Sequence, residues 1–323
     1  NTLEEVVAIG YQSLYKSSNL NDGAVSIGYE SMKNYLKGGS YQYTFTDIAS
    51  TTFDETERNI SASTAVGYQA LKGSDTESNN TGNWNTAFGH KALTSVSSGA
   101  FNVAVGSRSL MSNTSGIQNT AIGDNAMSEN TTGKWNVALG AGALKNNLSG
   151  FSSTAIGLSS LGANTTGVRN VAIGVNSLKM NTVGSANVAI GHSALRDMSG
   201  VNTVTSIADN FSYSPSSENT AVGNFSMMHN TEGSFNTAFG YSSLQYNTTG
   251  FNNTSIGIYT LFQNYGGVSN TALGSFALNG VQNGIDNVAV GSGSGQDLAN
   301  NSSNNTFLGS FAGGTSTNTI NDA

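Results

Sequence analysis

Short segments with apolar or β-branched residues at alternate positions recur along the whole chain, and each segment ends in a glycine. In the segment from Asn102 to Gly106, for example, Val103 and Val105 flank an alanine. An alternation with a period of two residues is typical of a β-strand. We therefore expect one short strand at each occurrence.

These terminal glycines return at a fixed interval. The spacing is 17 residues six times in succession between Gly89 and Gly191, and four times in succession between Gly223 and Gly291. A short period kept along a chain is typical of a solenoid, in which one repeat cannot bury its own apolar face and stacks on its neighbours. The pattern predicts an all-β fold, a parallel β-solenoid of about sixteen coils of ~17 residues. The sixteen glycines are Gly10, Gly28, Gly67, Gly89, Gly106, Gly123, Gly140, Gly157, Gly174, Gly191, Gly223, Gly240, Gly257, Gly274, Gly291 and Gly309.

A large apolar residue stands four positions after the terminal glycine. It is Leu or Met in fourteen of the sixteen repeats, and we expect one such core plug to fill the narrow interior of each coil. Burying a side chain of this size contributes about 1.5 to 3 kcal/mol. A second glycine ten residues after the first, as at Gly99 and Gly116, is expected at a turn, where a positive φ suits glycine. Six of the core plugs are Leu93, Leu110, Met127, Leu144, Leu178 and Leu195.

The residue two positions before the terminal glycine is small, Ala in thirteen repeats and Ser in two. If the flanking Val and Ile side chains point into the coil, this alanine points out of it. An outward row of alanines is an apolar stripe that a monomer would leave exposed, and we interpret it as an oligomer seam around a threefold axis parallel to the stack. The predicted seam contains Ala104, Ala121, Ala138, Ala155, Ala172 and Ala189.

Asparagine stands four positions before the terminal glycine in twelve repeats, from Asn85 to Asn305. Stacked in register, such side chains can form an amide ladder along the axis. Because strand register sets their position, we expect a structural role for them.

Composition narrows the possible functions. The chain has no cysteine, which excludes disulfides and thiolate sites, and we expect neither a metal nor a cofactor. A net charge of −7, with twelve Lys and Arg scattered along the chain, argues against nucleic-acid binding. No apolar run reaches the roughly 18 residues needed for membrane insertion. The first ten residues, NTLEEVVAIG, lack a basic region and an initiator Met, and we expect the sequence to be a mature or excised part of a longer protein.

The units NVAVG…SL, NTAIG…AM and NVAIG…SL resemble the head repeats of trimeric autotransporter adhesins and the related repeats of phage tail fibres. The resemblance covers nearly the whole chain. It implies a left-handed parallel β-roll that forms a homotrimer, in a virion tail fibre or elsewhere outside the cell, with adhesion or host recognition as its role. The implied partners are other tail or fibre proteins and a cell-surface glycan or protein receptor. The Asn-Thr-Thr-Gly turns, as at Asn130 to Gly133, favour the phage fibre over the nearest alternative, a bacterial trimeric surface adhesin.

Interruptions of the period divide the chain into segments. The first coils occupy residues 1–34, regular coils occupy 61–195 and 218–312, and 313–323 form a tail leading to a missing segment. Insertions at 35–60 and 196–217 should leave the solenoid as loops. Their aromatic and polar side chains suit either receptor contact or packing as caps against the coil edge. The candidate receptor-contact residues are Tyr35, Tyr41, Tyr43, Phe45, Phe53, Asp209, Phe211 and Tyr213.

Other chemistry finds less support in the sequence. The row Trp84, Phe101, Trp135 and Phe235 could bind glycan, although packing against a neighbouring chain is the favoured interpretation. Carboxylates in the first insertion, Asp54, Glu55 and Glu57, raise the alternative of a polysaccharide-cleaving tailspike, and a row of threonines eight residues after the terminal glycine raises that of an ice-binding protein. The three histidines do not suggest a catalytic site. We therefore predict a non-enzymatic structural and adhesive fibre protein.

Overall fold

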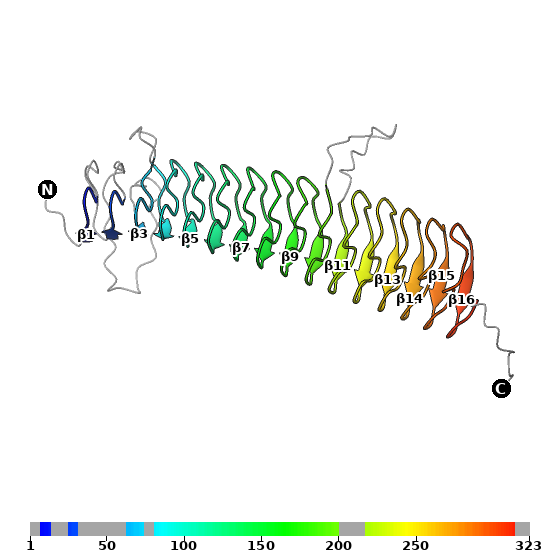
Figure 1. Cartoon of the computed structure of the whole chain (residues 1–323). Helices are drawn as coiled ribbons and strands as arrows, with labels where there is room; N and C mark the ends of the chain where they lie inside the picture. Colours follow the sequence, from blue (N-terminus) through cyan, green and yellow to red (C-terminus); the bar gives the residue numbers. More distant parts are fainter. Residues whose placement is uncertain (1–6, 14–24, 32–62, 74–80, 200–216, 314–323) are drawn as a thin grey trace, which may run out of the picture. The chain divides into compact units, whose positions relative to one another are not determined.

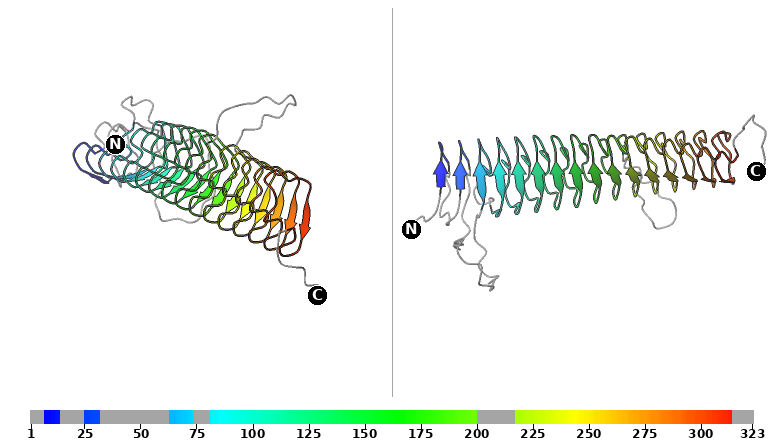
Figure 2. Two further views of the ribbon diagram at one scale, coloured as in Figure 1. Left: turned by 45° about the vertical axis from the view of Figure 1, so that its right-hand side comes forward. Right: turned by 90° about the horizontal axis from the view of Figure 1, so that it is seen from below.

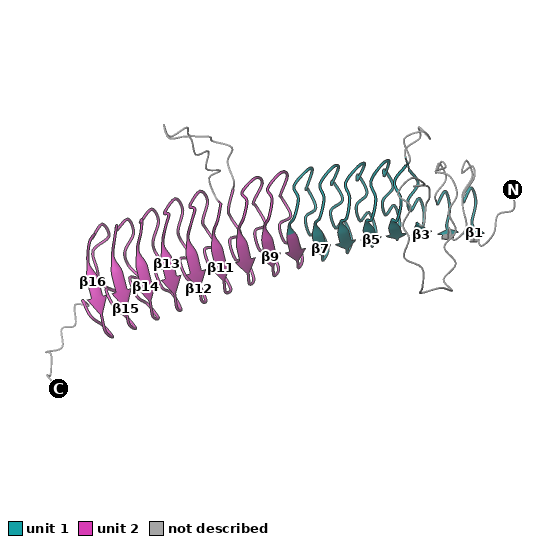
Figure 3. Ribbon diagram, turned by 180° about the vertical axis from the view of Figure 1, so that it is seen from behind, with its two compact units in different colours: residues 1–153 teal, residues 154–323 magenta. Residues whose placement is uncertain are grey.

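The computed structural model describes residues 7–13, 25–31, 63–73, 81–199 and 217–313 of the 323-residue chain. Within these ranges all regular secondary structure is β-strand, in sixteen segments of three residues each. The chain divides into two compact units, Asn1–Ser153 and Thr154–Ala323 (Figure 3). Each unit is a stack of coils with one short strand per coil.

The strands of each unit pair in parallel in the order in which they occur in the chain, and they form one face of the coils of their unit (Figures 1 and 2). Unit 1 contains β1 (Val7–Ile9), β2 (Val25–Ile27), β3 (Thr64–Val66), β4 (Thr86–Phe88), β5 (Val103–Val105), β6 (Thr120–Ile122) and β7 (Val137–Leu139). Unit 2 contains β8 (Thr154–Ile156), β9 (Val171–Ile173), β10 (Val188–Ile190), β11 (Thr220–Val222), β12 (Thr237–Phe239), β13 (Thr254–Ile256), β14 (Thr271–Leu273), β15 (Val288–Val290) and β16 (Thr306–Leu308).

Equivalent positions of successive coils stand beside one another. Ala104 of β5 pairs with Ala121 of β6, and Ala172 of β9 pairs with Ala189 of β10. This register repeats wherever strands pair within a unit, including β10 with β11, whose paired residues Val188 and Thr220 are separated by the second insertion. The predicted parallel β-solenoid is therefore confirmed, whereas its left-handed winding and its trimeric state stay predictions.

The row of alanines faces the interior, so the predicted oligomer seam at these residues is wrong. Ala104, Ala121, Ala138, Ala155, Ala172 and Ala189 are all 0% exposed. The residues on either side of each alanine are half-buried or exposed, as the burial patterns of β5 and β7 show. The sequence reasoning assumed that the larger side chains of the strand occupy the core. Instead the strand contributes its small side chain, and the large one comes from the turn that follows.

The core plugs supply that large side chain. The six plugs named above, from Leu93 to Leu195, are fully buried. Each has a left-handed backbone; φ is 48° at Leu110, for example. That conformation costs a non-glycine residue roughly 1–2 kcal/mol, but it turns the side chain inward and leaves the Leu110 N–H donating to the carbonyl of Ala126 in the next coil at 3.0 Å. Burial of the plug offsets this cost.

At β16 the large interior side chain comes from the strand, and the plug positions on both sides of it hold glycine. Phe307 takes the place of the interior alanine, and Gly295 and Gly313 stand where other repeats have Leu or Met. A Cβ atom added to Gly295 would lie 3.0 Å from Cδ2 of Phe307 and 2.8 Å from Cδ2 of Leu278. The two repeats that lack a plug are therefore those whose interior is occupied by a phenylalanine ring.

The two glycines of each coil are required for different reasons. Gly106, a terminal glycine, has φ of 127°, and an added Cβ would lie 2.5 Å from the carbonyl oxygen of Gly123. The second glycine has no left-handed φ, contrary to our expectation. At Gly99 an added Cβ would lie 2.6 Å from the carbonyl oxygen of Gly116 and 2.8 Å from Nδ2 of Asn113. Close approach between coils, not backbone freedom, requires glycine there.

The predicted asparagine ladder is present, and its members other than Asn305 are buried. Nδ2 of Asn119 donates to Oδ1 of Asn102 at 3.1 Å and to the carbonyl of Gly133 at 2.8 Å. A second ladder, which the sequence reasoning missed, runs through the asparagines seven positions after the terminal glycine. In it, Nδ2 of Asn130 donates to Oδ1 of Asn113 at 2.7 Å and Nδ2 of Asn147 to Oδ1 of Asn130 at 2.7 Å.

Candidate binding surfaces

The outer face of the strands carries two rows of side chains without a single charge. The first residue of each strand is Thr or Val, and the third is Ile, Val, Phe or Leu. Phe88 is 56% exposed, Leu139 44% and Leu273 43%. Isolated apolar residues are common on protein surfaces, but contiguous exposed apolar patches larger than a few hundred Å² mark interaction sites. The first and third residues of the strands define this strand face. Its row of third residues is the apolar stripe that the sequence reasoning had assigned to the alanines.

The predicted receptor-contact residues lie outside the described part of the chain. This applies to all eight residues from Tyr35 to Phe53 and from Asp209 to Tyr213, and to Asp54, Glu55 and Glu57 of the first insertion. The candidate surfaces below are therefore built from the coils themselves.

Two stacks of exposed aromatic rings lie among the described residues of unit 1. Tyr11, Tyr29, Tyr68 and His90 follow the terminal glycines directly, and their neighbouring ring centroids are 5.2 to 5.3 Å apart with nearly parallel planes. At the other turn, Trp84 and Phe101 stack at 6.2 Å. Such regular stacks cover ring faces with other ring faces.

Trp135 belongs to the same row as Trp84 but has polar neighbours. Its Nε1 donates to Oε1 of Gln118 at 2.6 Å, and Nζ of Lys134 lies 4.4 Å from the ring centroid. Phe151 contacts the ring edge-on at 6.4 Å. These contacts hold the exposed ring of Trp135 in place within unit 1.

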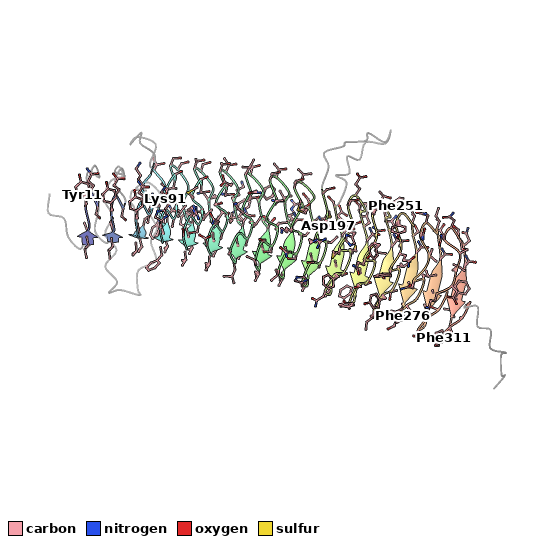
Figure 4. The ribbon with its side chains drawn as sticks, in the orientation of Figure 1. Tyr11, Lys91, Asp197, Phe251, Phe276 and Phe311 are labelled. Atoms are coloured by element: carbon pink, nitrogen blue, oxygen red, sulfur yellow. The ribbon has the colours of Figure 1, made fainter. Side chains whose placement is uncertain are left out.

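Unit 2 carries a larger and less regular group of rings, which we call the unit 2 ring cluster. Of the seven ring contacts between described residues of the cluster, five are perpendicular, among them Phe225 with Tyr241 at 5.8 Å and Tyr246 with Phe262 at 5.0 Å. Phe276, at one margin of the cluster, lies at the opposite end of the coils from Phe251 (Figure 4). The cluster comprises His192, Phe225, His229, Tyr241, Tyr246, Tyr259, Phe262 and Phe276.

A fixed group of ionisable side chains adjoins these rings. Asp197 accepts from Nε of Arg196 at 2.7 Å and from Nη2 at 2.9 Å, and its Oδ2 lies 2.8 Å from Nδ1 of His229. Burial alone would raise the pKa of Asp197, but its interactions with Arg196 and His229 outweigh burial and hold that pKa below the usual range. A hydrogen bond with Tyr241 raises the pKa of the Tyr259 hydroxyl.

The threonine row considered for ice binding is engaged in the fold. Oγ1 of Thr114 donates to the carbonyl of Thr131 at 3.1 Å, Thr131 to Leu148 at 2.8 Å, and Thr248 to Tyr265 at 2.7 Å. Each of these hydroxyl hydrogens bonds to the next coil. The row therefore has a structural role in linking coils.

The described residues offer few other sites for chemistry. They contain no group of three or more His, Asp or Glu side chains that could hold a metal ion. None of them forms a helix of the length and hydrophobicity needed to cross a membrane. The Asp197–His229 pair resembles two members of a catalytic triad in its Nδ1 contact, but no hydrogen bond from His229 to a serine or threonine hydroxyl accompanies it among the described residues.

Comparison with known proteins yields no relative for this chain. No protein-family model matches it, and neither a curated protein nor a solved structure does so at a significant level.

Sequence reasoning missed two of these surfaces for identifiable reasons. The strand face was missed because a period of two does not tell the inner side of a strand from the outer. The unit 2 ring cluster was missed because its members occupy four different positions of the repeat. Comparison of the outward positions coil by coil would have found it, since aromatic residues gather there between Gly191 and Gly274.

Proposed function

We propose that this chain is a structural and adhesive fibre protein, part of a phage tail fibre shaft that contributes to host receptor binding and works as a homotrimer outside the cell. The observation that carries the proposal is the uncharged strand face, together with the resemblance of the repeat to fibre and adhesin repeats. A monomer would leave Phe88, Leu139 and their equivalents in water. Association of copies through this face removes that cost.

The repeat favours copies that lie parallel around a common axis. Successive strands of a sheet are about 4.8 Å apart, so two copies related by rotation about an axis parallel to the stack make the same contact at every coil. The two rows also differ in size, with Thr86 beside Phe88 and Thr237 beside Phe239. The large row of one copy can pack against the small row of the next, a head-to-tail contact that closes into a ring.

Molar mass in solution, measured by light scattering, tests the assembly. We expect three times the chain mass of 33.2 kDa. Ile122→Lys places a charge on the strand face, where assembly would bury it unpaired, and should reduce the mass to that of one chain. Asn125→Lys is the matched control, because Lys91 occupies the same position of another coil with a similar left-handed φ. A wild-type mass of one chain, or dissociation by both variants alike, would contradict the proposal.

A further inference from the structure

The coil itself does not require the unit 2 ring cluster. Its rings occupy the first, second, fifth and sixth positions after the terminal glycine. In the five coils that close at Gly106 to Gly174, none of these four positions carries an aromatic residue or a histidine, yet the strands and turns are the same. In the five coils from Gly191 to Gly274 the same positions carry eight rings. Since the scaffold forms without them, the rings serve something other than the fold.

The geometry of the cluster leaves ring faces open. Two stacked rings cover one face each, whereas in a perpendicular pair only one of the two rings has a face covered. Tyr241 is perpendicular to Phe225 (88°) and to Tyr259 (81°), and it is 42% exposed. Phe262 is likewise perpendicular to Tyr246 and Tyr259. The regular tyrosine stack of unit 1, with interplanar angles of 16° and 7°, lacks this property.

Polar groups with fixed directions lie beside the rings. Arg196, Asp197 and His229 hold one another in place. Tyr241 and Tyr259, whose ring centroids are 5.4 Å apart, each add a hydroxyl that can donate and accept. The guanidinium retains N–H donors beyond the two it gives to Asp197, and the carboxylate retains acceptor capacity. The charges of Arg196 and Asp197 offset each other, so this part of the surface has no strong preference for an anion or a cation.

An oligosaccharide has the matching chemistry. A pyranose ring presents C–H groups on one face, which pack on an aromatic face, and neighbouring hydroxyls at its edge, each able to donate and to accept. We propose that the unit 2 ring cluster, with Arg196 and Asp197, is a binding site for a neutral oligosaccharide. This inference rests on the proposed adhesive function and names the ligand class for one of its surfaces.

Binding to an array of immobilised bacterial and animal oligosaccharides, followed by calorimetric titration with the free form of those that bind, tests the site. We expect binding by the wild-type chain, and binding about tenfold or more weaker for Tyr241→Ala, as for a central aromatic anchor. Tyr68→Ala is the matched control: Tyr68 stands at the same position of its coil and is 41% exposed, but it lies in the unit 1 stack. It should bind like the wild type.

A second variant, Phe262→Ala, guards against a local effect of one substitution and should also weaken binding. The absence of any oligosaccharide ligand, or an equal loss in Tyr241→Ala and Tyr68→Ala, would overturn the inference; so would binding only of a protein partner. Light scattering on the same samples shows whether the proposed binding site or the proposed trimer is wrong. A trimer that binds no oligosaccharide contradicts the site alone, whereas a monomer contradicts the proposed assembly.

Discussion

Removal of one rung of the first asparagine ladder should destabilise the coils on both sides of it. The side chain of Asn119 takes part in four hydrogen bonds. Its Nδ2 donates to Oδ1 of Asn102 and to the carbonyl of Gly133, at 3.1 and 2.8 Å. Its Oδ1 accepts from the backbone N–H and from Nδ2 of Asn136, at 3.1 and 3.2 Å. Asn119→Ala removes all four.

The magnitude follows from what each partner retains. Oδ1 of Asn102 still accepts from the backbone N–H of residue 119, at 3.0 Å, and Nδ2 of Asn136 still donates to Gly150 at 2.8 Å. The backbone N–H of Asn136 loses the acceptor that the ladder supplies. Each hydrogen bond contributes about 0.5–1.5 kcal/mol, and a buried group left unsatisfied costs about 1–3 kcal/mol. We therefore expect the free energy of unfolding to fall by about 3 to 7 kcal/mol.

Urea-induced unfolding followed by circular dichroism, at one chain concentration, measures this loss. Because a stack of coils can unfold in stages, amide hydrogen exchange across residues 130–140 supplies a local readout, and protection should fall there first. Ser152→Ala is the matched control, since Ser152 is exposed and Ala186 occupies the same position of another coil with the same φ of 57°. If Asn119→Ala costs no more than Ser152→Ala, the ladder does not stabilise the stack and the reasoning fails.

Three further predictions concern other parts of the coil. Phe307→Ala should be destabilising because it leaves a cavity, and Gly295→Leu because it overpacks the interior. The double variant restores the usual pairing of a small strand residue with a large plug, so in urea unfolding it should lose less stability than the two single variants lose together; additive losses would contradict this. Gly106→Ala should lose more than about 2 kcal/mol in the same assay, because its Cβ meets the carbonyl of Gly123 at a φ of 127°; a neutral result would contradict the close approach. The lowered pKa of Asp197 contributes stability that is present above the unfolded pKa of about 3.9 and is lost as pH falls through the folded pKa. The difference in unfolding free energy between wild type and Asp197→Asn should therefore shrink below pH ~4. A difference that does not depend on pH would contradict this.

The strand face shows where sequence reasoning reached its limit. The alternation of Val103, Ala104 and Val105 identified the strand correctly, but both sets of side chains are apolar, so hydrophobicity gave no direction. The deciding fact is the size of Leu110, which enters the same narrow interior from the following turn and is fully buried there. Beside such a plug the strand has room only for a small side chain, alanine or serine. Phe307 agrees with this explanation, because its larger ring lies where Gly295 replaces the plug.

The sequence by itself determined the period, the position of the strands, the plugs and the first ladder of asparagines, because each depends on residues that recur at fixed separations along the chain. Only the tertiary structure decided which side of the strand is the core and which coils gather the ring cluster of unit 2. These features depend on distances between residues of different coils, such as the 5.4 Å between the rings of Tyr241 and Tyr259. Stacking creates those distances, and no single repeat contains them.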